Sequence, residues 1–144
     1  MSTRAFYTFI GSPNEPRLNV YVHADGYPSG AAADLNKALP YAWPLPRFEN
    51  DEFAAAFVAA TKVGPRGKPT PGHVRLFPSG DDWSEHAPGD IQFRYEISHN
   101  GTDLIVGAFT VNFDPNGKDA GKRLFKGSLA KFTKWAKSKA NTAG

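Results

Sequence analysis

The residues best suited to chemistry lie in one short stretch, YVHADGYPSGAAADL, at residues 21–35. Its alternate positions carry two phenol rings, an imidazole and a carboxylate: Tyr21, His23, Asp25 and Tyr27. Alternate residues of a strand point to one face, so these groups converge on one spot if the strand continues to Asp25. Stacking rings, a titratable donor and a carboxylate are typical of a ligand site.

The same stretch leads into a predicted helix that has Ser29 as its N-cap and ends near Leu39, before Pro40. The free N–H groups of a helix N-terminus attract anions. We therefore predict that an anionic small molecule or nucleotide binds here, with Ser29 among its contacts. A purely structural role stays open, in which Asp25 bonds its own turn amides and the tyrosines seal the hairpin.

A second wall for this site is predicted in YAWPLPRFE, residues 41–49. Trp43 supplies a stacking surface there, and Arg47 supplies a forked donor for a carboxylate or phosphate. Arg75, in a short predicted strand, is a further candidate to oppose the ligand's charge. The alternative is a rigid proline clasp, whose aromatic rings fill the gap between two helices.

No complete catalytic or metal-binding signature is present. Cysteine is absent, which excludes thiolate zinc sites and a thiol nucleophile. A metal site would need further ligands beside His23 and Asp25, and no pair of the candidates shows a spacing that is diagnostic of metal binding. These candidates are His73, Asp81, Asp82, His86 and His99. We therefore predict a binding protein without a metal or cofactor. A hydrolase in which Asp25 orients His23 as general base is the enzymatic alternative.

The positive charge is concentrated near the C-terminus. Residues 115–144 carry eight Lys and Arg against one Asp, a net charge of +7, whereas residues 1–114 carry −4. The candidate nucleic-acid-binding residues are Lys122, Arg123, Lys126, Lys131, Lys134 and Lys137. Three interpretations remain open for this segment: a packing helix with a solvated lysine face, a basic arm that binds nucleic acid or inhibits a host protein, and a membrane-surface helix.

Hydrophobic periodicity predicts an α+β fold in a single domain: an antiparallel sheet of about five strands with helices packed on one face. Residues 1–118 form the predicted core domain, and residues 119–144 contain a basic amphipathic C-terminal helix. The expected strands span residues 3–10, 17–23, 73–77, 91–98 and 104–113, with an Asn-Gly turn joining the last two. The expected helices span residues 29–39, 50–62, with Asn50 as cap, and 122–139.

The N-terminal residues offer no signal-peptide pattern, and no apolar run is long enough to cross a bilayer. We therefore expect a cytoplasmic protein.

The segments YVHADGYPSGAAADL and LPYAWPLPRFENDEFAAAFVAA, with the GHVRL and FRYEI strands, resemble a group of small bacterial, prophage and mobile-element proteins without a characterised function. The resemblance covers about residues 3–113. In that group the position of Val22 is often basic and that of Ala24 often tryptophan, so this chain lacks a charge and a ring there. The resemblance implies a phage or mobile-element setting, in which small proteins often sequester components of host defence.

Overall fold

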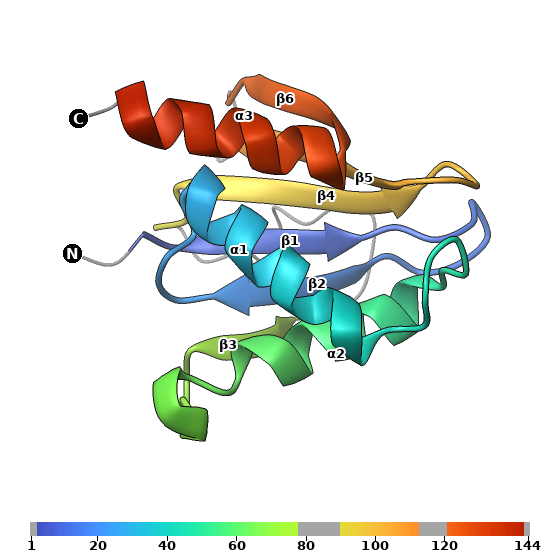
Figure 1. The fold of residues 1–144 in the computed structure, drawn as a ribbon, viewed down its shortest axis with the longest axis horizontal. Coiled ribbons are helices and arrows are strands. Elements are labelled where there is room, and N and C mark those ends of the chain that lie inside the picture. The colour runs from blue at the N-terminus through green and yellow to red at the C-terminus, as the bar shows by residue number, and fades with distance from the viewer. Residues whose placement is uncertain (1–2, 78–89, 113–120, 143–144) are drawn as a thin grey trace.

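The computed structural model describes residues 3–77, 90–112 and 121–142 of the chain (Figure 1). In chain order its elements are β1 (Ala5–Phe9), β2 (Leu18–Val22), α1 (Pro28–Ala38), the 3₁₀ turn η1 (Leu39–Tyr41), α2 (Asn50–Thr61), the 3₁₀ turn η2 (Pro65–Gly67), β3 (Val74–Phe77), β4 (Phe93–His99), β5 (Leu104–Thr110), β6 (Arg123–Ser128) and α3 (Leu129–Thr142). The predicted α+β class is confirmed.

The strands form one sheet in the order β3-β2-β1-β4-β5-β6. All neighbours are antiparallel except β1 and β4, which run parallel with Tyr7 opposite Tyr95. The prediction of about five antiparallel strands is thus only partly confirmed, because the described residues form six strands and their sheet is mixed. The parallel pair arises because β1 lies in the middle of the sheet and receives β4 from a distant part of the sequence.

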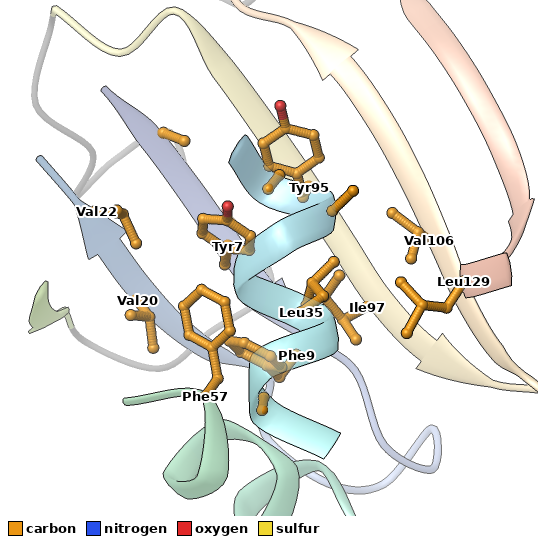
Figure 2. Packing of buried hydrophobic residues seen from close by; sticks show 14 of the residues in the cluster. Tyr7, Phe9, Val20, Val22, Leu35, Phe57, Tyr95, Ile97, Val106 and Leu129 are labelled. Atoms are coloured by element: carbon orange, nitrogen blue, oxygen red, sulfur yellow. The ribbon is translucent and has the colours of Figure 1, made fainter. Parts of the chain in front are cut away.

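The three helices cover one face of the sheet, as predicted (Figure 1). Alternate residues of the central strands point to that face, and Tyr7 and Phe9 of β1 pack there against Phe57 of α2 (Figure 2). Leu35 of α1 and Phe132 of α3 complete this layer, both with 0% exposure. Each such side chain contributes about 1.5–3 kcal/mol by leaving water, so this layer fixes the helices on the sheet.

The opposite face of the sheet carries a smaller apolar cluster made by Phe6, Tyr21 and Ile91. Beside it the Thr8 hydroxyl donates a 3.0 Å hydrogen bond to the Asn19 side chain, and both residues are buried. The pairing of β1 with β2 sets these contacts, since it places Phe6 opposite Tyr21 and Thr8 opposite Asn19.

The Asn-Gly turn between β4 and β5 is confirmed. The Asn100 side-chain oxygen accepts hydrogen bonds from the backbone N–H groups of Thr102 and Asp103, and Gly101 has a φ of +96°. That left-handed conformation is accessible to glycine without the steric cost of a Cβ.

Both predicted helix caps were wrong. α1 begins at Pro28, which leaves Ser29 inside the first turn, because the fixed φ of proline suits the first helical position. α2 begins at Asn50 itself, with Glu49 at the cap position. The buried Asn50 amide instead donates to the carbonyl oxygens of Phe9 and Pro16, which joins α2 to the first hairpin.

The predicted helix over residues 122–139 was wrong in its first part. Arg123–Ser128 forms β6, which pairs antiparallel with β5, and the helix begins at Leu129. Phe125 points to the helix-covered face and packs against Phe132, because its partner in the register is the buried Ala108. Within the described residues, no helix combines the length and apolarity needed to cross a membrane.

Candidate functional site

The segment that joins β2 to α1 turns sharply at Asp25, whose φ is 60°. The left-handed residue is thus Asp25 and not one of the neighbouring glycines. Gly26 and Gly30 serve close packing instead, since a Cβ at Gly26 would lie 2.5 Å from Ala5 Cβ and one at Gly30 would overlap the Asp25 carbonyl oxygen. Because β2 ends at Val22, Asp25 does not continue the strand alternation.

Tyr21 and His23 share the sheet face opposite the helices, as their spacing predicted. The Tyr21 hydroxyl lies 2.8 Å from His23 Nδ1. The Tyr21 ring is only 4% exposed and packs edge-on against Phe77, with ring centres 5.9 Å apart. The buried Tyr21 therefore orients the His23 ring through its hydroxyl group and is not itself accessible to a ligand.

A chain of polar contacts fixes the orientation of the His23 ring. Arg4 forms a 3.1 Å ion pair with Asp90, and its guanidinium lies near the Tyr21 hydroxyl, where it opposes the rise in the pKa of Tyr21. Burial raises the pKa of Tyr21 above its usual value of 10.0, so the phenol keeps its proton. Among the described contacts, the Tyr21 hydroxyl can donate this proton to Nδ1 of His23. In the neutral imidazole the remaining proton is then on Nε2.

His23 lines a hollow of about 460 Å³ at one end of β2 and β3, together with Pro71, Gly72, His73 and Arg75. The backbone joins the two histidines, because the His23 N–H donates a 2.8 Å hydrogen bond to the His73 carbonyl oxygen. Arg75 lies opposite Tyr21 in the register and is exposed. The hollow is thus lined by two imidazoles and a guanidinium.

Charged groups on the α1 side act on this hollow. Burial lowers the pKa of His73, Asp25 raises it, and His23 and Lys37 lower it further. Burial likewise raises the pKa of Asp34 on α1 to about 6, although Lys37 opposes the shift. At neutral pH His73 is therefore mostly uncharged, and its ring offers one donor and one acceptor.

The other predicted residues of the turn lie beside the hollow and do not line it. The Tyr27 ring is 43% exposed, and its hydroxyl donates a 3.4 Å hydrogen bond to Asp25. Asp25 raises the pKa of Tyr27. Ser29 is partly buried in the first turn of α1.

Trp43 and Arg47 do not belong to this site. They follow the C-terminal end of α1, whereas His23 precedes its N-terminal end, and an eleven-residue helix is about 16 Å long. The Arg47 guanidinium lies 3.5 Å from the centre of the Trp43 ring. The backbone N–H of Trp43 donates a hydrogen bond to the Glu52 carboxylate. These contacts match a structural clasp and separate both residues from the hollow.

The geometry of the described residues does not support the catalytic interpretation or the metal-site interpretation. The described contacts of His23 include no hydrogen bond to Asp25, so the orienting contact of the hydrolase hypothesis is missing. In the described part of the chain no three His, Asp or Glu side chains gather as metal ligands. His99 stacks on Phe48 instead, with ring centres 5.4 Å apart. Three residues weighed as metal ligands lie outside the described ranges: Asp81, Asp82 and His86.

The basic C-terminal residues lie along one edge of the fold and are exposed. Lys122 precedes β6, which carries Arg123 and Lys126; α3 carries Lys131, Lys134 and Lys137. The apolar stripe of α3 is buried, with Phe132 at 0% and Ala136 at 1% exposure. α3 is therefore a packing helix, and the face that a membrane-surface helix would insert is already used.

His73 is the lining residue that the site prediction left out. It entered the sequence analysis only as a metal partner, and its place beside His23 depends on the pairing of β2 with β3. A second hollow, of about 480 Å³, lies between α2 and the β2–β3 edge. Alanines of α2 and the side chains of Leu18, Val20 and Leu76 line most of it, with Asp51 and Asn19 as its polar residues.

Comparison of the chain with protein-family models, with curated proteins and with solved structures yields no match in any of the three. The resemblance to prophage and mobile-element proteins therefore stays a prediction, and the candidate site depends on its geometry alone.

Proposed function

We propose that this protein binds an anionic small molecule, such as a nucleotide, in the hollow formed by His23, His73 and Arg75. The observation that carries this proposal is the contact chain from Asp90 through Arg4 and Tyr21 to His23. It favours one tautomer, in which His23 Nε2–H is the free donor on an exposed ring.

The chemistry of the lining suits a phosphate or carboxylate. A guanidinium binds such groups through two parallel hydrogen bonds, and charged hydrogen bonds of this kind are the stronger ones. Arg75 supplies that fork, and His23 supplies a second donor from the neighbouring strand. Uncharged His73 accepts or donates one further bond, which suits a hydroxyl group next to the anion.

Binding without turnover is the use we propose for these groups, since the lining residues include no Ser, Thr, Asp or Glu side chain beside the two imidazoles. The resemblance to mobile-element proteins fits such a role, in which the protein sequesters an anionic ligand of host defence. The phage origin and the defence role are part of the proposal.

Isothermal titration with a panel of nucleotides and with inorganic phosphate tests this function. We expect His23→Ala and Arg75→Gln each to weaken binding of the best ligand by about tenfold, as expected for loss of a hydrogen bond to a charged group. Arg47→Gln removes the same charge at the far end of α1 and should leave the affinity unchanged. Absence of heat with every ligand, or equal losses in Arg75→Gln and Arg47→Gln, would reject the proposal.

A further inference from the structure

The edge of the sheet formed by β6 and α3 carries an uninterrupted excess of positive charge. Its described residues, 121–142, contain seven Lys and Arg and no Asp or Glu. We define the basic band as five of these side chains: Lys122, Arg123, Lys126, Lys131 and Lys134.

The band passes around β6 from one face of the sheet to the other. Lys126 and Arg123 lie opposite Gly107 and Phe109 of β5, which places them on the face away from the helices. Lys131 lies on the other side of the strand, since a Cβ at Gly127 would be 4.0 Å from Lys131 Cβ. Lys134, one helical turn further along α3, is exposed and continues the band.

The cations of the band have no described carboxylate partner. Glu96 of β4 lies in the same row of the sheet as Lys126, with Gly107 between them, but its carboxylate forms a 2.8 Å ion pair with Arg94. Like charges held together without counter-charges repel one another, and a bound polyanion relieves this repulsion while releasing its own counterions. β6 is also the last strand at its edge of the described sheet, so none of the described strands pairs with its outer backbone N–H groups.

We infer that the basic band binds the phosphate backbone of nucleic acid without sequence preference. Charge complementarity selects this partner. Insertion of α3 into an anionic membrane is disfavoured because it needs an apolar face, and Leu129, Phe132 and Ala136 are buried against the sheet and α1. This surface lies at the opposite edge of the sheet from the His23 hollow, so it is independent of the proposed ligand site.

Fluorescence anisotropy with a labelled single strand of about 12 nucleotides, and with the matching duplex, tests this inference. The full-length chain is titrated at several salt concentrations. The band variant carries Lys126→Gln, Lys131→Gln and Lys134→Gln. The control carries Lys62→Gln, Arg66→Gln and Lys68→Gln, three exposed cations of the α2–β3 connection, and so has the same net charge.

The slope of log affinity against log salt changes by about 0.7 per phosphate contact for a single strand and by about 0.9 for a duplex. We expect the band variant to bind at least about tenfold more weakly at low salt, with a slope shallower by about 2 for the single strand. The control should keep both values. Equal losses in the two variants, no binding by the unsubstituted chain, or tighter binding to phosphatidylserine vesicles than to either nucleic acid would overturn the inference.

Discussion

The Tyr21 hydroxyl lies 2.8 Å from Nδ1 of His23, and this contact joins the smaller apolar cluster of the sheet to the hollow lined by His23 and His73. Tyr21 is itself held by Phe77 and by Arg4, which is paired with Asp90. Because these supports are buried or paired, the His23 ring is oriented before any ligand arrives. Such preorganisation lowers the entropy that binding must overcome.

Tyr21→Phe tests this orientation. The ring remains in its apolar cluster, but the hydroxyl that bonds His23 is lost, so both neutral tautomers of His23 should become populated. Loss of one hydrogen bond corresponds to about 1 kcal/mol, or about a fivefold weaker anion affinity. Long-range ¹H–¹⁵N spectra report the tautomer, and isothermal titration reports the affinity. An unchanged tautomer together with an unchanged affinity would contradict the role assigned to Tyr21.

Asp34→Asn should stabilise the protein at neutral pH. Burial raises the pKa of Asp34 from 3.8 to about 6, and its buried Oδ2 has no hydrogen-bond partner. The folded state therefore binds the proton more tightly, and the stability that this provides is lost as the pH rises from about 4 through about 6.

The free energy of unfolding of both proteins, measured with urea at several pH values, checks this prediction. The advantage of Asp34→Asn over the natural chain should grow between pH 4 and pH 7, by no more than about 3 kcal/mol. Partial exposure of the carboxyl reduces this limit. A difference that does not depend on pH would show that Asp34 is not the titrating group.

His73 should produce the opposite pH dependence. Burial lowers its pKa from 6.5, so the unfolded state binds a proton more readily than the folded state. Its contribution to stability is complete above about pH 6.5 and is lost as the pH falls below that value. His73→Gln should flatten this acid-side decline in urea titrations. The same slope in both proteins would assign the decline to other groups.

Arg47→Gln should disturb stability and not ligand binding. The guanidinium stacks on Trp43 at 3.5 Å, and an exposed pair of this kind contributes about 0.5–1 kcal/mol. Thermal unfolding should therefore show a small loss, while titration with the anionic ligand shows none. A large loss of affinity would return Arg47 to the binding site.

Phe132→Ala should destabilise the whole domain by about 3–5 kcal/mol, because the ring is fully buried between β4 and β6 side chains. Lys134→Gln on the opposite side of α3 should change the free energy of unfolding by less than about 0.5 kcal/mol. Circular dichroism during urea unfolding checks both. If Phe132→Ala unfolds α3 in a separate early step, the helix is not an integral part of the core.

Local patterns in the sequence predicted much of the sheet. The alternation of Leu18, Val20 and Val22 identified β2 and placed Tyr21 and His23 on the other face, since the strand period is two. The same reasoning could not detect the parallel pairing of β1 with β4, which depends on tertiary packing and not on local periodicity.

The errors have similar causes. The helix prediction includes residues 123–128 because Phe125 extends the apolar stripe of α3, yet pairing with β5 decides their conformation. Asp25 was expected beside Tyr21, but the chain leaves the strand at Val22 and turns at φ 60°. Trp43 and Arg47 were assigned to the site without the length of α1, which separates them from His23.

The position of β1 has a consequence for how the molecule forms. Phe6 pairs with Tyr21 through a short connection, but its other neighbour, Arg94, is synthesised much later. Contacts between such distant residues slow folding, since a long loop must close before they form. During translation, one edge of β1 therefore stays unpaired until β4 has been synthesised. In that interval this edge can bind a chaperone or aggregate with another chain.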